Sequence, residues 1–96
     1  MGINDVIGDR KQEILALAAK YGAYNVRVFG SVAQGTADET SDVDFLVDLE
    51  DGRSLFDLGG LLMDLQGLLQ RKVDVLTENG LHWYIKDRIL KEAELL

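Results

Sequence analysis

The chain has 96 residues, and its 17 acidic and 10 basic side chains give a formal net charge of −7. This length suits a single small domain over residues 1–96, able to bury somewhat more than about 60% of its unfolded surface. The chain has no cysteine, which excludes disulfides and thiolate metal sites. The acidic charge disfavours direct binding to a nucleic-acid backbone and fits a basic protein partner better.

The 47% hydrophobic content is typical of a globular core. No apolar run approaches the length of a membrane span, and the first residues lack the basic and apolar regions of a signal peptide. We therefore expect a cytoplasmic protein without a membrane partner.

The first predicted element is a helix over residues 5–21, because apolar residues recur there at helical spacing from Ile7 to Tyr21. Gly22 is placed to end this helix. We expect the helix to cover one face of a sheet.

A short apolar run over residues 26–29 predicts the first strand, which leads directly into Gly30 and Ser31. Glycine lets the backbone turn sharply and approach a ligand closely. If Ser31 opens a helical turn through residue 34, the backbone N–H groups there suit an anion such as a triphosphate.

Residues 43–49 alternate in the pattern of a second strand, so Asp42 and Asp44 share one face. Residues two apart on a strand lie about 6.6 Å apart along it. At about 5 Å, two carboxylates repel by roughly 1 to 3 kcal/mol, which favours an exposed site or a bound divalent cation. Taken alone, such a pair is also common at a solvated strand end. We expect the two strands to be antiparallel, with residues 36–41 as a solvated surface loop between them.

Residues 50–53 predict a turn, with Arg53 expected at the surface and a phosphate contact as the alternative. Ser54 and Asp57 resemble a capping box at the start of a helix whose leucines repeat through residue 69. Three glycines weaken this helix by up to about 1 kcal/mol each relative to alanine. We expect all three to mark close packing: Gly59, Gly60 and Gly67.

Residues 73–76 predict a short strand with Asp74 on the face opposite its valines. Because a helix connects this strand to the previous one, the pair should be parallel with a right-handed crossover. Parallel strands would place Asp74 at the same end of the sheet as Asp42 and Asp44, as a candidate third acid.

Residues 78–80 predict a turn, and apolar residues spaced by four predict a final helix over residues 81–93. His82 is expected on the helix surface and not as a metal ligand. Trp83 and Tyr84 are expected to pack in the ordinary way, with a partner-facing surface as the alternative.

In order, the elements read α-β-(short α)-β-α-β-α and predict an α/β (α+β) fold, a small mixed sheet of three to four strands flanked by helices. The order strand, Gly30-Ser31, ten residues, Asp42-x-Asp44, strand resembles the signature of the nucleotidyltransferase superfamily that includes polymerase beta. More narrowly, nearly the whole chain resembles the minimal nucleotidyltransferase (MNT) family, including the MntA-type antitoxins.

The resemblance implies a nucleotidyltransferase fold and an enzyme whose catalytic, metal-binding acids are Asp42, Asp44 and Asp74, with two Mg²⁺ ions. Gly30 and Ser31 would hold the phosphates of ATP. It also implies an antitoxin that transfers AMP from ATP to a tyrosine of a HEPN-domain ribonuclease toxin. The expected assembly is a hetero-oligomer with that toxin, with a homodimer as the alternative.

One departure concerns the residues after Gly-Ser, where many relatives carry arginines and this chain has Val32, Ala33 and Gln34. A cationic phosphate contact is therefore missing or supplied by the partner. Two other hypotheses stay open. The first is a binding antitoxin that neutralises its partner without catalysis. The second is a small-molecule nucleotidyltransferase acting on an aminoglycoside, which the absence of an acceptor domain disfavours.

Overall fold

Strand β2 (Val43–Leu49) is an inner strand of a four-stranded sheet in the computed structural model, which describes residues 1–96. The strand order is β3-β2-β1-β4. Strand β1 (Ala23–Phe29) runs antiparallel to β2 and to β4 (Glu94–Leu95), whereas β3 (Val73–Leu76) runs parallel to β2. The predicted antiparallel and parallel pairings are therefore confirmed.

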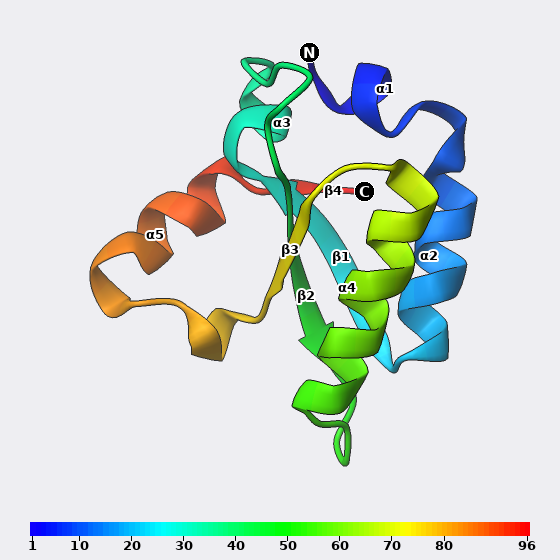
Figure 1. Cartoon of the computed structure of the whole chain (residues 1–96). Coiled ribbons are helices and arrows are strands. Elements are labelled where there is room, and N and C mark those ends of the chain that lie inside the picture. Colours follow the sequence, from blue (N-terminus) through cyan, green and yellow to red (C-terminus); the bar gives the residue numbers. More distant parts are fainter.

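Helices lie on both faces of the sheet (Figure 1). Helices α2 (Lys11–Lys20) and α4 (Leu55–Leu69) pack against each other on one face, and α5 (Trp83–Glu92) lies on the other. The short α1 (Ile3–Val6) precedes α2, and α3 (Gly30–Gln34) follows β1 directly. This arrangement confirms the predicted mixed sheet flanked by helices.

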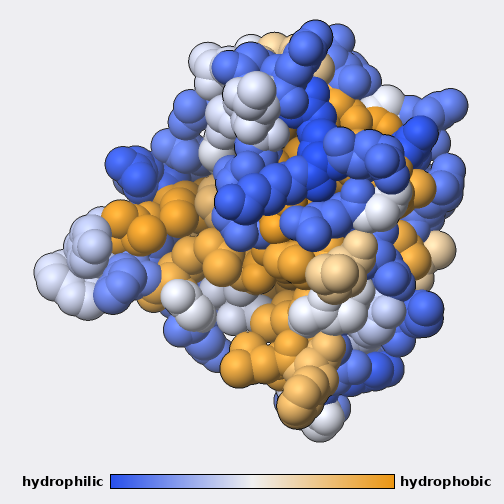
Figure 2. Space-filling model, in the orientation of Figure 1, coloured by the Kyte–Doolittle hydropathy of each residue, from blue (hydrophilic) through white to orange (hydrophobic).

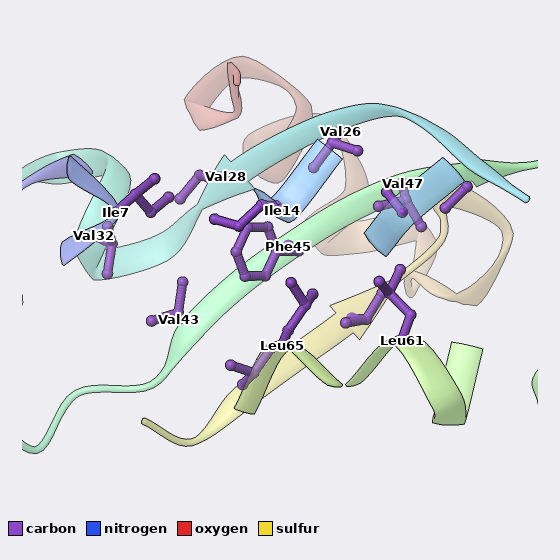
Figure 3. Close-up of a cluster of buried hydrophobic side chains, with 14 of the residues drawn as sticks. Ile7, Ile14, Val26, Val28, Val32, Val43, Phe45, Val47, Leu61 and Leu65 are labelled. Atoms are coloured by element: carbon purple, nitrogen blue, oxygen red, sulfur yellow. The ribbon is translucent and has the colours of Figure 1, made fainter. Parts of the chain in front are cut away.

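The alternation of β2 divides the apolar side chains between the two faces. Its odd-numbered residues face α2 and α4, where Phe45 lies in the middle of the larger apolar cluster (Figure 3). On the other face, Leu46 packs with Phe29 and Ile89 in a smaller cluster beneath α5. Asp44 shares this second face, so the acids lie on the side of the sheet that carries α5.

The first helical segment is broken, which corrects the prediction of one helix over residues 5–21. A 3-10 turn at Gly8–Arg10 separates α1 from α2. Gly8 has a φ of +55°, a left-handed conformation that interrupts a helix. Apolar residues keep helical spacing across the break, so the pattern does not reveal it. The predicted helix stop at Gly22 is confirmed by its φ of +74°.

The capping box at the start of α4 is confirmed. The Ser54 N–H donates to Asp57 Oδ2 at 3.0 Å, and the Ser54 hydroxyl accepts from the Phe56 N–H at 3.2 Å. Arg53 pairs with Asp57 at 3.2 Å and with Glu50 at 3.7 Å. Arg53 therefore has the surface role expected of it, at the far end of β2 from the acids.

Close packing holds for only one of the three glycines in α4. A Cβ at Gly60 would lie 2.5 Å from Cε1 of the Tyr21 ring. Gly59 and Gly67 face open space, so the prediction is wrong for these two. Both glycines lower the stability of the helix, and no packing contact within the chain offsets this loss.

The C-terminal region differs from the prediction in two ways. Glu94–Leu95 form β4, which no sequence pattern predicts because two residues cannot show alternation. Trp83 and Tyr84 are 85% and 66% exposed, so ordinary packing is wrong for them, while His82 is exposed as predicted. Figure 2 shows apolar atoms gathered around α5 and near the start of α4, with hydrophilic atoms above them.

None of the helices combines the length and apolar character that crossing a bilayer requires.

Candidate active site

Asp44 and Asp74 are neighbours across the parallel β2–β3 pair, near the start of each strand. By strand alternation, Asp44 lies on the same face as Leu46, which packs beneath α5. Asp42 lies just before β2. Partial burial raises the pKa of Asp44 to about 6, helped by the negative charges of Asp74 and then Asp42. Asp44 therefore lies within electrostatic reach of both other acids, and the predicted placement of Asp74 beside Asp44 at one end of the sheet is confirmed.

The turn between β1 and α3 lies directly against this cluster. Phe29 is the β1 partner of Asp44, and Gly30 follows it with a φ of +72°. Asp44 Oδ2 occupies the space that a side chain at Gly30 would fill. The Ser31 carbonyl accepts a hydrogen bond from the Thr36 N–H at 2.9 Å, which ties the end of this turn to the following loop. The helical turn predicted after Gly30 is confirmed as α3.

The three site carboxylates form no ion pair with the chain's own basic residues. Some acids elsewhere are paired, for example Asp48 with Arg27 at 3.0 Å and Asp64 with Lys20 at 3.6 Å. Like charges gathered without a cation repel each other, and this repulsion adds to the effect of burial in raising the pKa of Asp44. The cluster is therefore suited to a cation from outside the chain.

The chemistry of these ligands fits Mg²⁺, which prefers carboxylate oxygens and keeps several waters and substrate phosphates as further ligands. No group of three acidic or histidine side chains is close enough to form a complete metal site. Two features favour Mg²⁺ at these acids: their oxygens are ligands that it prefers, and no basic side chain of the chain pairs with them. Water and substrate would supply the remaining ligands.

The acid cluster lies on an open surface. Three cavities are present, and none is lined by Asp42, Asp44 or Asp74. The largest, about 510 Å³, lies between α1, α3 and β4. A large acceptor can therefore approach the acids without entering a pocket.

The loop before Asp42 is more ordered than the sequence suggested, because Asp38 is not simply solvated. Its carboxylate accepts hydrogen bonds from the Thr40 N–H at 2.8 Å, the Thr40 hydroxyl at 2.7 Å and the Ser41 hydroxyl at 3.1 Å. These bonds, first those from Thr40, lower the pKa of Asp38. An aspartate followed closely by hydroxyl residues is a known turn pattern and was the available signal.

Comparison with known proteins identifies the family of this chain. Residues 11–96 match the nucleotidyltransferase domain family. The chain belongs to this family and is a nucleotidyltransferase. Within the family it is of the minimal, MntA-like type.

Two sequence relatives are similar over almost their whole length. A proposed protein adenylyltransferase of Methanocaldococcus jannaschii is 43% identical over 93 residues, covering 97% of this chain and 96% of the relative. The protein adenylyltransferase MntA of Thermococcus cleftensis is 36% identical over 91 residues, covering 95% and 89%.

Two solved structures share the fold. A proposed minimal nucleotidyltransferase aligns with a TM-score of 0.87 and 44% identity, covering 100% of this chain and 97% of the other. A toxin–antitoxin crystal structure with AMP-PNP aligns with a TM-score of 0.75 over 88% of this chain and 69% of the other. At 21% identity, the second match concerns the fold alone.

Proposed function

We propose that this chain, as a single domain over residues 1–96, is an antitoxin that transfers AMP from Mg-ATP to a tyrosine of a HEPN ribonuclease toxin and thereby silences it. The convergence of Asp42, Asp44 and Asp74 beside Gly30 carries this proposal. A protein that only binds its partner has no need of three acids without ion pairs at one end of the sheet.

In the proposed reaction the tyrosine hydroxyl oxygen attacks the α-phosphorus of ATP. The bond from that phosphorus to the oxygen bridging to the β-phosphate breaks, and pyrophosphate leaves with the bonding electrons. Asp74, the exposed acid, accepts the hydroxyl proton. Gly30 and Ser31 bind the β- and γ-phosphates and orient the leaving group.

Asp42 and Asp44 would hold the Mg²⁺ ion on the triphosphate and share a second ion with Asp74. When bound, Mg²⁺ supplies neutralisation of the charge that develops on the phosphates. The chain's own part is to hold its carboxylates at one point and to keep them free of internal cations.

Three observations favour a protein acceptor. The acid cluster is open, and residues 1–96 contain no second domain that could enclose a small molecule. The relatives' names include protein adenylyltransferase, and a toxin–antitoxin structure shares the fold. The net charge of −7 favours a basic partner.

The test incubates the purified chain with Mg-ATP and the toxin encoded beside it, followed by intact-mass measurement of both proteins and a ribonuclease assay. We expect the toxin to gain the mass of one or more AMP units, mapped to tyrosine, as its ribonuclease activity disappears. The double variant Asp42→Ala with Asp44→Ala should abolish the gain, while Asp51→Ala, on an exposed turn, should leave it intact. Silencing without a mass gain would instead support the binding antitoxin.

A further inference from the structure

We infer that Arg71 is a positioning residue that sets the place of Asp42 relative to Asp74; the inference rests on the proposed function. Arg71 lies just before β3, three residues ahead of Asp74. Its Nη1 donates to the carbonyl of Asp38 at 2.8 Å and to the carbonyl of Ser41 at 3.2 Å. Ser41 is the residue immediately before Asp42, so one guanidinium joins the segments that lead to two of the acids.

The backbone hydrogen bonds between β2 and the segment before β3 do not include Asp42. The Val43 N–H donates to the Lys72 carbonyl at 3.0 Å, so the backbone pairing of β2 with the β3 segment begins only after Asp42. Asp42 itself lies outside the paired strands. The guanidinium of Arg71 extends the connection between the two segments back beyond Asp42, to the 38–41 loop.

Arg71 differs from the paired arginines of the chain because its Nη1 binds two carbonyl oxygens and its Nη2 contacts Met1 Sδ at 3.7 Å. Arg27 and Arg53 each bind two carboxylates, whereas Arg71 has no carboxylate within 4 Å. Hydrogen bonds from a charged donor are stronger than those between neutral groups, and here one nitrogen, Nη1, binds both carbonyls. A lysine at this position would keep the charge, but its ammonium nitrogen is one bond closer to the backbone than Nη1 and would reach the two carbonyls less well.

Loss of the Arg71 hydrogen bonds should therefore weaken metal binding and AMP transfer at the acids. Mutating a residue that orients metal ligands without binding the metal typically lowers metal affinity or activity by about 10- to 100-fold. We expect Arg71→Ala to lower kcat/KM for AMP transfer by about this factor, because Asp42 would no longer be held beside Asp44 and Asp74.

The experiment compares Arg71→Ala, Arg71→Gln and Arg71→Lys with the unaltered chain and with Arg53→Ala as the matched control. Arg53 also ties a loop to the chain, but at the opposite end of β2. Four quantities are measured: kcat for AMP transfer, KM for ATP, the dissociation constant of Mn²⁺ alone by electron paramagnetic resonance, and Tm. We expect Arg71→Ala and Arg71→Gln to weaken Mn²⁺ binding about tenfold or more, Arg71→Lys to lie between these and the unaltered chain, and Arg53→Ala to match the unaltered chain.

The inference is overturned if Arg71→Ala binds Mn²⁺ and turns over within about twofold of the unaltered chain, or if Arg53→Ala shows equal losses. If Arg71→Ala does not fold, Arg71→Gln and Arg71→Lys decide the question by the same criteria. An unaltered chain without transferase activity would refute the proposed function, while the Mn²⁺ measurement would still test Arg71. An active chain whose Mn²⁺ binding ignores Arg71 would refute this inference alone.

Discussion

Gly30 and Asp44 share one space: the Oδ2 atom of Asp44 lies where the first side-chain atom of any other residue at position 30 would be. The glycine is required twice over, because its φ of +72° also lies in the left-handed region. This contact joins the turn after β1 to the acid on β2.

Replacing Gly30 should therefore disrupt the site as well as strain the backbone. In Gly30→Ala the Cβ would displace the Asp44 carboxylate, and we expect AMP transfer to fall by about 100-fold, as displacements of about 1 Å can cause. Gly52→Ala is the matched control, since Gly52 has a φ of +85° with open space around it. It should lose about 1 kcal/mol of stability from strain while retaining full activity. Equal activity losses in the two variants would contradict the contact.

The raised pKa of Asp44 predicts that this residue lowers the stability of the fold more above pH 6 than below it. The folded pKa of about 6 exceeds the ordinary value of 3.8, so ionisation disfavours the folded state. The penalty is absent below pH 3.8, grows as pH rises toward 6 and is complete above 6. In metal-free buffer at pH 8, Asp44→Asn should therefore raise the free energy of unfolding by about 1 to 2 kcal/mol, a value reduced for partial exposure.

Denaturant unfolding across this pH range measures the effect. The gain from Asp44→Asn should shrink as pH falls through 6 and vanish below 3.8. Asp51→Asn, on an exposed turn, should change the free energy of unfolding by less than about 0.5 kcal/mol. A pH-independent gain would show that ionisation of the partly buried Asp44 is not the cause.

Proton and metal should compete for the cluster, because Asp44 must be ionised to serve as a metal ligand. Below pH of about 6 Asp44 is mostly protonated, so the Mg²⁺ concentration for half-maximal transfer should rise by up to about tenfold per pH unit. The measurement is a Mg²⁺ titration of initial rates at saturating ATP between pH 5 and 8. A constant Mg²⁺ requirement over that range would exclude Asp44 as a ligand.

The adjacent glycines of α4 should respond in opposite directions to alanine. Gly59→Ala places a methyl group in open space and removes the helix cost of glycine, so it should stabilise the chain by about 0.5 to 1 kcal/mol. Gly60→Ala places its methyl group against the Tyr21 ring and should destabilise it by about 1 to 3 kcal/mol. Thermal unfolding of the two variants gives both signs directly, and a stabilised Gly60→Ala would refute the ring contact.

The sequence by itself determined the elements that carry the site. Alternation over residues 43–49 predicts the strand and puts Asp44 on the face opposite Phe45, and the helix after it makes the β2–β3 pair parallel. These inferences hold because strand period and crossover topology are local and steric. The sequence alone therefore places Asp74 at the same end of the sheet as Asp44.

Only the tertiary structure decided the contacts between distant segments. The Gly30–Asp44 contact, the Arg71 link to the 38–41 loop and the exposure of Trp83 depend on how separate elements pack. The break at Gly8 leaves no periodic signal, because the apolar residues on either side of it keep helical spacing. Strand β4 leaves none either, because two residues cannot show alternation, and it pairs with Arg27 and Val28 far along the chain. Periodicity reports which face a residue occupies; the distance between two faces is set by the side chains that fill the space between them.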